Sequence, residues 1–248
     1  MVQIIGLKNI PLIKRCDNIG DHIVQAAKGQ GLQIADRDII VVAQKIVSKA
    51  EGNVIHLKDV TPSPLAEKVA KNSGKDPRQV ETILRESAGI VRMTGGHLIV
   101  ETRHGFVCAN AGVDRSNVED QDSVVLLPKD PDLSAREIRQ RIKALTGANV
   151  GVIVSDTFGR AWRIGQVNVA IGVAGFRPTM DYRGSKDMFG YVLNVTQMAI
   201  ADELASAAEL VMKKSDRIPV AIIRGVEYTQ GKGSAKDLVR PKEDDLFR

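Results

Sequence analysis

The sequence predicts a mixed α/β (α+β) fold, formed by residues 1–248 as a single unit of one lobe or two. Strand-like and helix-like patterns alternate along the chain, and several short apolar runs are bounded by polar turns. A length of 248 residues is sufficient to bury a large core, and a composition of 43% hydrophobic and 26% charged residues is typical of globular proteins. No Gly-x-Gly-x-x-Gly motif opens a helix after a strand. Residues 225–233 are one position too long for a phosphate loop.

The first elements are indicated by an apolar run and a capping residue. Residues 38–43 form a short apolar run after a polar turn, which predicts a buried strand. Ser63 can cap a helix over residues 65–71, with Pro64 at its first position, where the missing N–H group costs nothing.

A second helix and a hairpin follow in the sequence. Asp76 and Pro77 repeat the cap-and-proline pattern and predict a helix that runs toward residue 86. Residues 97–102 and 105–110 are strand-like and flank a short turn, so we expect a β-hairpin.

A third helix is predicted over residues 135–145. Ser134 would be its N-cap, Glu137 would complete a capping box, and Gly147 would end it. Residues 150–155 are the most strand-like run in the chain.

The last two elements are a long helix and a strand. An alanine-rich helical pattern covers residues 192–214 and ends in two lysines, which the helix dipole favours there. Residues 219–223 predict a final strand.

Composition also limits the classes of function. The start of the chain lacks the features of a secretory signal, no window reaches the roughly 20 apolar residues of a membrane span, and there are 2 cysteines, so we expect a cytoplasmic protein without membrane contact. The formal charge of +5 suits an anionic partner. Aromatic residues make up only 4% and no basic run interleaves with them, so a small anionic ligand is favoured over nucleic acid.

Two acidic segments share one pattern, in which an apolar strand ends at an aspartate within a loop of small and polar residues. They are residues 108–117, with Asp114, and residues 154–160, with Asp156. Carboxylates at strand ends can hold Mg²⁺ or Mn²⁺ together with substrate phosphates. Thr157 and Asn117 add neutral oxygen and amide groups. The alternative is that both aspartates are ordinary turn or cap residues.

Basic residues adjoin these segments. Arg160 and Arg163 suit phosphate or carboxylate binding, because guanidinium groups offer planar pairs of donors; the alternative is a solvated basic loop with Trp162 as a lid or core residue. Lys49 follows the first predicted strand and could reach a phosphate, or be a surface lysine. The histidines and cysteines lack metal-ligand spacing, which argues against zinc.

The chain resembles the coenzyme F420:L-glutamate ligase family over essentially its whole length. The resemblance rests on short blocks in a fixed order. They are Ile-Pro-Leu-Ile-Lys at residues 10–14, Ser-Lys-Ala-Glu-Gly at 48–52, Asn-Ala-Gly-Val-Asp at 110–114, Ser-Asn at 116–117, Ser-Asp-Thr-Phe-Gly-Arg at 155–160, Arg163 with Gly165, Ala-Ile-Gly at 170–172, Lys186-Asp187 and Arg224-Gly225.

The resemblance implies a GTP-dependent ligase that adds L-glutamate to the phospholactyl carboxylate of a coenzyme F420 precursor. The carboxylate would receive the γ-phosphoryl group of GTP, the glutamate amine would displace phosphate, and a second, γ-linked glutamate could follow. It also implies Mg²⁺ or Mn²⁺, assistance by K⁺, an intertwined homodimer and a nucleotide-binding fold unlike the standard ones.

Roles for individual residues follow from the same resemblance. Asp114 and Asp156 would hold the first metal ion, and Thr157 would contribute to a second. The residues that would contact GTP are Ile10, Pro11, Leu12, Ile13, Gln44, Lys45, Lys49 and Asn117, with Gln44 and Lys45 acting through their backbone. Arg160 is added as a clamp on the chemistry of its side chain alone.

One segment departs from the family pattern. Some relatives carry a Gly-Glu-Gly-rich sequence with an acidic residue near the nucleotide, whereas residues 212–217 read Met-Lys-Lys-Ser-Asp-Arg. The departure weakens the expected second metal site unless Asp216 supplies the acid. Two alternatives to this ligase stay open: one on the same scaffold that joins another acid and amine, and a non-catalytic anion-binding or nucleic-acid-binding module.

Overall fold

The computed structural model describes residues 1–116 and 120–246. Its α-helices are α1 (Ile19–Gly29), α2 (Gln44–Glu51), α3 (Pro64–Ser73), α4 (Pro77–Arg85), α5 (Pro131–Thr146) and α6 (Ile200–Met212). Its strands are β1 (Gln3–Gly6), β2 (Ile39–Ala43), β3 (Val54–His56), β4 (Ser87–Thr94), β5 (His97–Thr102), β6 (Val107–Ala109), β7 (Ser123–Val125), β8 (Gly151–Arg160), β9 (Arg163–Ala174), β10 (Met180–Asp181), β11 (Gln197–Met198) and β12 (Val220–Arg224). Short 3₁₀ turns include η2 (Asn110–Gly112). The fold is mixed α/β, as the sequence predicts.

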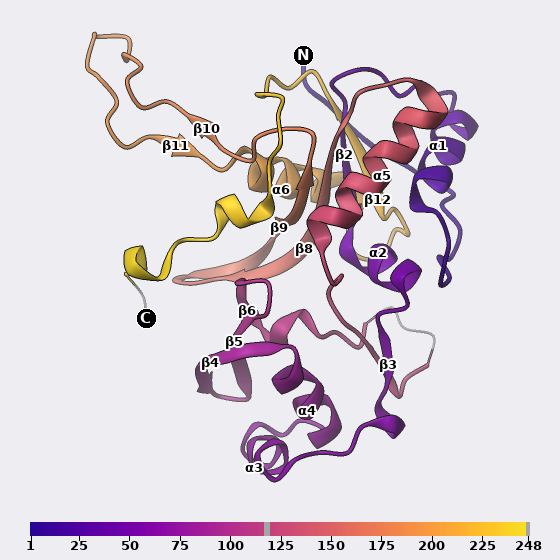
Figure 1. Ribbon diagram of the computed structural model, residues 1–248, viewed down its shortest axis with the longest axis vertical. Coiled ribbons are helices and arrows are strands. Elements are labelled where there is room, and N and C mark those ends of the chain that lie inside the picture. The colour runs from indigo at the N-terminus through magenta and orange to yellow at the C-terminus, as the bar shows by residue number, and fades with distance from the viewer. Residues whose placement is uncertain (117–119, 247–248) are drawn as a thin grey trace.

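A five-stranded sheet in the order β1-β12-β2-β8-β9 forms the centre of the larger lobe (Figure 1). Strands β2 and β8 run parallel, and the other neighbouring pairs are antiparallel. Residues 39–42 of β2 are all fully buried, which requires cover on both faces of the sheet. Helix α5 provides it on one face, with α1 packed beside it, and α6 on the other.

Helix α5 lies unusually close to the sheet at β9. Gly172 permits this approach, since a Cβ at that position would overlap the Pro131 carbonyl at the start of α5. The Asp132 carboxylate then accepts a hydrogen bond of 2.7 Å from the Val173 backbone N–H. This contact fixes α5 against the strand that pairs with β8.

A smaller lobe lies below the main sheet in Figure 1 and carries its own apolar clusters. It contains the antiparallel pair β3–β7, helices α3 and α4, and the sheet β4-β5-β6. Its larger cluster joins Leu57, Ile83, Leu98, Val100, Ala111, Val113 and Val124. Because Ala111 and Val113 belong to this cluster, the segment that leads to Asp114 is anchored in the smaller lobe.

Several sequence predictions are confirmed. The runs at 38–43 and 219–223 become β2 and β12, and residues 97–110 form the hairpin β5–β6. Ser63 and Asp76 cap α3 and α4, each with proline in the first turn.

The predicted start of the third helix is wrong. Helix α5 begins at Pro131, and the Asp130 carboxylate accepts the capping hydrogen bond from the Leu133 backbone N–H at 2.9 Å. Ser134 lies inside the helix, where its hydroxyl donates to Glu51 Oε1 at 2.6 Å. Aspartate followed by proline is an equally good start signal. The predicted end at Gly147 is confirmed, with a left-handed φ of 78°.

The predicted helix over residues 192–214 is too long. Helix α6 begins at Ile200, and residues 192–199 form the returning side of an arm that projects from the body of the protein (Figure 1). Within the arm, β11 pairs with β10. The β-branched residues Val192, Val195 and Thr196 favour extended backbone over helix.

The acidic segment 154–160 was expected to be a loop, and that expectation is also wrong. Strand β8 continues through Asp156 and Thr157 to Arg160, paired throughout with β9. Glycine and threonine interrupt the alternation of apolar and polar residues in this segment, so the sequence alone did not indicate a strand here.

Across the parts of the chain described above, none of the helices combines the length and apolar character needed to cross a bilayer.

Candidate functional site

Four chain segments meet at one edge of the main sheet, called the site edge. Parallel strands β2 and β8 place Ala43 beside Ser155, and the Ala43 N–H donates to the Pro219 carbonyl at 2.9 Å. Pro219 immediately precedes β12, and the segment after Gly6 leaves β1 at the same edge. Ligands of open α/β sheets bind outside the carboxyl ends of parallel strands, so a ligand is expected at this edge.

Asp114 reaches the site edge from the smaller lobe. Its backbone pairs with Val125 through hydrogen bonds of 3.1 and 2.8 Å. Its carboxylate accepts two bonds of 2.8 Å from the Ser116 N–H and hydroxyl, and Lys45 Nζ lies 2.6 Å from its Oδ2 atom. Lys45 stands in the first turn of α2, directly after β2, so two lobes meet through this ion pair.

The charge state of Asp114 follows from these contacts. Partial burial alone would raise its pKa, but the hydrogen bonds from Lys45 and Ser116 outweigh burial, and the pKa lies below the ordinary value. Asp114 is therefore a carboxylate whose negative charge is already compensated.

Asp156 stands on β8 and is a carboxylate of a different kind. It is half-buried, and burial raises its pKa to about 6. A hydrogen bond from the Thr157 backbone N–H opposes this shift only in part. No side chain of the described residues donates a hydrogen bond to it that would balance its charge at close range.

Asp114 and Asp156 lie close enough to sense one another's charge. The negative charge of Asp114 raises the pKa of Asp156, and the positive charge of Lys45 lowers it. Buried Cys108, on β6, has its pKa raised to about 12 by burial and then by the charge of Asp156. Asp114, Asp156 and Lys45 therefore lie within reach of one another's charges, and the region that they share is called the common space.

Three buried polar atoms around this space have no hydrogen-bond partner within residues 1–116 and 120–246. They are Gln44 Nε2, Asn110 Oδ1 and Ser155 Oγ, which belong to the first residue of α2, the first residue of η2 and the residue before Asp156. Buried polar groups are nearly always paired, so these three atoms, like His22 Nδ1 and His104 Nδ1 elsewhere in the described residues, are candidates for contact with a polar ligand or ion.

The oxygen ligands that these residues offer suit one divalent cation. Asp114 and Asp156 supply carboxylate oxygens, and Asn110 supplies an unpaired amide oxygen, the ligand types that Mg²⁺ and Mn²⁺ prefer. Groups of three or more His, Cys, Asp or Glu suited to a metal do not occur among the residues described, so any ion here needs ligands from a substrate or from water.

Thr157 belongs to a second polar group beside Asp156. Its hydroxyl donates to Asn168 Oδ1 at 2.8 Å and accepts from Lys214 Nζ at 2.7 Å. Lys214 also contacts Asn168 Oδ1 at 3.1 Å and Glu209 Oε2 at 3.1 Å. The sequence marked Lys214 only as a charge at the end of a helix. Its contact with Thr157 could not be predicted from the sequence, because the two residues are 57 positions apart and only the fold brings them together.

Arg160 lies further along β8, at the turn into β9. Four residues of strand separate it from Asp156, or roughly 13 Å at the usual rise. Its guanidinium group donates to the Ile164 carbonyl at 2.6 Å and to the Gly165 carbonyl at 3.3 Å. Arg160 is therefore tied to its own hairpin. Trp162, at the hairpin tip, is 83% exposed and forms no part of the core.

The residues expected to contact GTP lie around the site edge in two groups. Gln44, Lys45 and Lys49 all belong to α2. Gln44 and Lys45 directly follow β2, whereas Lys49 stands in the last turn of the helix, so the expectation that it lies at a strand end is wrong. Residues 10–13 follow β1, with Ile10 packed on the core, Pro11 and Leu12 exposed, and Ile13 buried.

A cavity of about 570 Å³ adjoins the segment after β1. Its walls are formed by Lys8, Asn9 and Ile10 on one side and by residues 216–218 on the other. Asp216, the acidic residue considered for a second metal, lines this cavity and pairs with Lys213 at 3.2 Å. The cavity lies at the site edge, because Lys8, Asn9 and Ile10 follow β1 and residues 216–218 precede β12.

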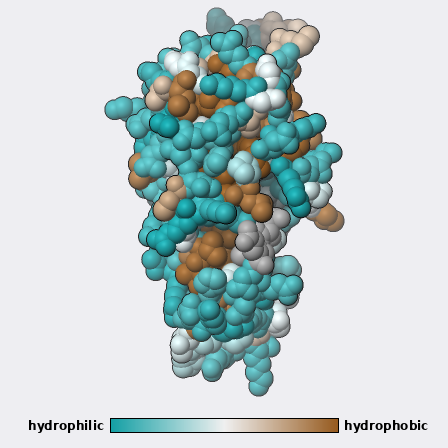
Figure 2. Space-filling view, turned by 90° about the vertical axis from the view of Figure 1, so that its right-hand side faces the viewer, coloured by the Kyte–Doolittle hydropathy of each residue, from teal (hydrophilic) through white to brown (hydrophobic). Residues whose placement is uncertain are grey.

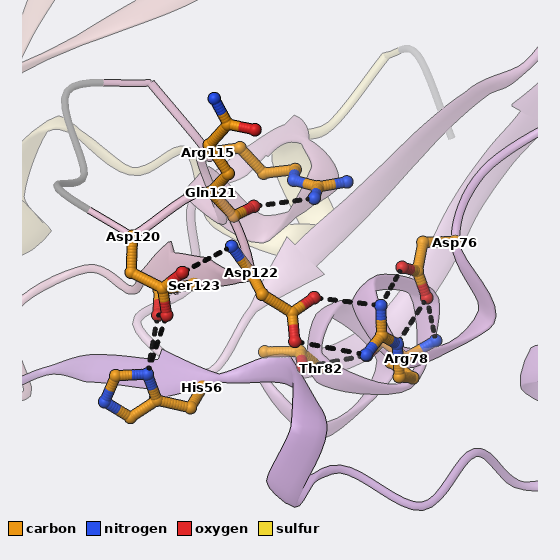
Figure 3. Close-up of polar contacts among 9 residues, drawn as sticks. All are labelled: His56, Asp76, Arg78, Thr82, Arg115, Asp120, Gln121, Asp122 and Ser123. Carbon is orange, nitrogen blue, oxygen red and sulfur yellow. Dashed lines mark hydrogen bonds and ion pairs between the residues drawn. The ribbon is translucent and has the colours of Figure 1, made fainter.

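Asn117 lies outside the described residues, but the two ends of its loop are held firmly (Figure 3). Arg115 donates to the Gln121 carbonyl at 2.8 Å. Arg78, on α4, is paired with Asp122 at 2.9 Å and Asp76 at 2.7 Å. These contacts fix the loop that carries Asp114 against the smaller lobe.

Beside this loop, Asp120, Ser123 of β7 and His56 of β3 come together without forming a catalytic triad. His56 Nδ1 contacts both Ser123 Oγ, at 2.8 Å, and Asp120 Oδ2, at 3.2 Å (Figure 3). A triad uses opposite ring nitrogens for serine and aspartate, so this arrangement serves to anchor the loop.

Comparison with known proteins gives a consistent result. Residues 8–225 match the family described as F420-0:Gamma-glutamyl ligase. Three curated relatives are each named coenzyme F420:L-glutamate ligase. That of Methanothermobacter thermautotrophicus is 47% identical, covering 100% of this chain and 99% of the relative. That of Methanocaldococcus jannaschii is 48% identical, covering 100% and 97%. That of Methanopyrus kandleri is 43% identical, covering 98% and 97%.

Proposed function

The chain belongs to the F420-0:gamma-glutamyl ligase family, and on that premise we propose that it joins L-glutamate to the phospholactyl carboxylate of a coenzyme F420 precursor. The reaction consumes GTP and passes through an acyl phosphate, and a second glutamate is added through the γ-carboxylate of the first. The observation that carries the proposal is the convergence of Asp114 and Asp156, from two lobes, on one space beside Lys45.

We propose that Asp114 and Asp156 hold one Mg²⁺ or Mn²⁺ ion. Such an ion would neutralise charge on the phosphoryl group that is transferred. Asp156 supports this role because its carboxylate is buried and poorly compensated, so it gains most from a cation. Lys45 adds a fixed positive charge on the same side of the space.

The nucleotide is proposed to lie along the site edge between α2 and the segment after β1. Residues 10–13 and the cavity beside Lys8 support this placement, and Gln44, Lys45 and Lys49 are proposed as contacts from α2. Asn117 is proposed as a further contact from its loop. The proposed assistance by K⁺ rests on the family resemblance alone.

In this reaction the covalent intermediate forms on the substrate, so the protein mainly positions the reactants and compensates their charge. Forming an acyl phosphate brings a carboxylate and a triphosphate together, and positive charges must offset their repulsion. Lys45 and Lys214 both favour the ionised form of Asp156 and can supply such charge. Arg160 can act as a clamp only after it releases the carbonyls of its own turn.

We also propose a homodimer, which is supported by the projecting arm. Residues near the arm tip expose large apolar side chains to water: Met188 88%, Phe189 87%, Tyr191 67% and Val195 87%. By contrast, the side that carries α1 and β3 is mainly hydrophilic, with small separate apolar patches (Figure 2). An arm that lacks a core of its own and is covered with apolar residues is best explained by a second copy that covers it.

A product assay tests the proposed reaction. The purified chain is incubated with the F420 precursor, GTP, Mn²⁺ and a mixed pool of amino acids, and the products are weighed by mass spectrometry. We expect a mass gain of one or two glutamyl groups, lost when GTP or the metal is omitted. A gain of another amino acid would change the substrate, and no gain, with salt-dependent binding of nucleic acid instead, would contradict the ligase.

A further inference from the structure

Lys214 occupies an unusual position for a lysine at the end of a helix. Although its side chain is 61% exposed, its ammonium group contacts three oxygens: Thr157 Oγ1 at 2.7 Å, Asn168 Oδ1 at 3.1 Å and Glu209 Oε2 at 3.1 Å. The oxygens come from β8, β9 and α6, so the contact needs all three elements in place.

The backbone conformation at Lys213, the residue before Lys214, allows this contact. Lys213 ends α6 with φ 50° and ψ −171°, a left-handed φ that is strained for a residue with a side chain. This turn sends consecutive lysines in different directions. Lys213 Nζ lies 3.2 Å from Asp216, and Lys214 turns toward β8.

The oxygens around Lys214 are those that a cation beside Thr157 would use. The Thr157 hydroxyl donates its proton to Asn168 at 2.8 Å and accepts from the lysine, so both of its hydrogen-bonding functions are in use. A magnesium ion would need several oxygen ligands at roughly 2.0–2.1 Å. An ammonium group bound to the same oxygens leaves no place for it and repels it.

The ammonium also acts on the neighbouring carboxylate. The positive charge of Lys214 favours ionised Asp156. Lys214 therefore does at this position what a bound cation would do: it supplies positive charge both to Asp156 and to any phosphate that lies between Asp156 and Thr157.

We propose that the Lys214 ammonium takes the place of a second divalent cation beside Thr157, so that each protomer loads one divalent ion, at Asp114 and Asp156. This inference deepens the proposed function and rests on it. Its consequence is that one of the two mobile +2 ions of a two-metal site is replaced by a fixed +1 charge of the chain, which is independent of metal concentration.

Counting bound Mn²⁺ tests the inference without reference to turnover. Free Mn²⁺ is measured by electron paramagnetic resonance during titration of the full chain with one equivalent of a non-hydrolysable GTP analogue, and a titration of the nucleotide alone is subtracted. The variants are Lys214→Glu, which replaces the ammonium by a carboxylate ligand, and Lys213→Glu, which makes the same charge change at the adjacent residue. Circular dichroism confirms that each is folded.

We expect one Mn²⁺ per protomer for the unmodified chain and for Lys213→Glu, and two for Lys214→Glu. Two ions in the unmodified chain, or one in Lys214→Glu, would overturn the inference and leave the proposed function standing. No bound ion in the unmodified chain would instead remove the metal role of Asp114 and Asp156. If Lys214→Glu fails to fold, Lys214→Gln takes its place, because it frees the same oxygens; a second, weaker ion is expected, and its absence would overturn the inference.

Discussion

Asp114 and Asp156 adjoin the same common space, but the two regions that carry them shift the pKa of a carboxylate in opposite directions. The Asp114 loop, anchored in the smaller lobe, surrounds its carboxylate with Lys45 and Ser116 and lowers its pKa. Strand β8, buried in the larger lobe, leaves the Asp156 carboxylate poorly compensated and raises its pKa to about 6. The two lobes thus contribute one satisfied and one unsatisfied ligand.

The difference explains how a cation could be bound without a dedicated cage. A site with two fully compensated carboxylates would gain little from a metal ion, and a site with two uncompensated ones would repel itself when empty. One compensated and one uncompensated carboxylate keep the empty site stable, and the uncompensated one still makes binding of a divalent ion favourable. Substitutions on either side of this contrast should therefore have different effects.

Replacing the unsatisfied carboxylate should have the largest effect. We expect Asp156→Asn to reduce glutamate-dependent GTP hydrolysis by roughly 10³-fold or more, since a metal ion contributes several kcal/mol to such reactions. Activity of the variant within tenfold of the unmodified chain would remove Asp156 from the metal site. Asp59→Asn, a charge control at an exposed position of the smaller lobe, should lose far less.

The same variant should keep its fold. Because the pKa of Asp156 is raised in the folded protein, from 3.8 to about 6, the stability that its protonated form provides is lost as the pH rises from about 4 to 6. Metal-free Asp156→Asn should therefore melt at or above the temperature of the unmodified chain at pH 8. A large drop in melting temperature would show that its lost activity reflects unfolding.

The pH dependence of metal affinity is the next largest effect. Asp156 must lose its proton to bind a cation, so Mn²⁺ affinity should be constant above pH about 6 and fall about tenfold per unit below it. Asp114, with its lowered pKa, stays ionised throughout this range. Calorimetric titrations at pH 5, 6, 7 and 8 measure the profile. An affinity that is flat down to pH 5 would contradict the raised pKa.

Removing the charge between the two carboxylates should separate metal binding from nucleotide binding. Lys45→Met frees the Asp114 oxygen that Lys45 contacts at 2.6 Å, so Mn²⁺ should bind more tightly, while KM for GTP should rise; each change is on the order of tenfold. Lys28→Met, on the exposed side of α1, provides the matched control. If both affinities weaken together, Lys45 supports the fold of the site rather than its charge balance.

Ser116 should have the smallest effect. Ser116→Ala removes the hydroxyl bond of 2.8 Å to Asp114 and keeps the backbone bond, so we expect a loss of about 1 kcal/mol in stability and a few-fold loss in activity. Ser116→Thr retains the hydroxyl and should restore both. Failure of threonine to restore them would mean that side-chain volume, and not the hydrogen bond, matters at this position.

The sequence predicted the local features of the fold better than its long-range ones. Caps at Ser63 and Asp76 and the buried run of β2 depend on neighbouring residues, and they were correct. The extension of β8 through Asp156 depends on pairing with β9, and the late start of α6 depends on the arm, so neither could be read from local pattern.

The candidate site divides in the same way. The two aspartates could be chosen from their segments and from the family resemblance. Their different surroundings could not, because Lys45 is 69 positions before Asp114 and Lys214 is 58 positions after Asp156 in the sequence. The burial that raises the pKa of Asp156 is a property of the packed lobe.

The central claim, that Asp114 and Asp156 share one divalent ion, is tested most directly by Mn²⁺ affinity in Asp114→Asn, Asp156→Asn and the double variant. If one ion bridges both carboxylates, each single variant loses most of the affinity, and the double variant loses little more than either one. Losses that simply add, or a single variant that binds Mn²⁺ as the unmodified chain does, would show that the two carboxylates do not act on the same ion.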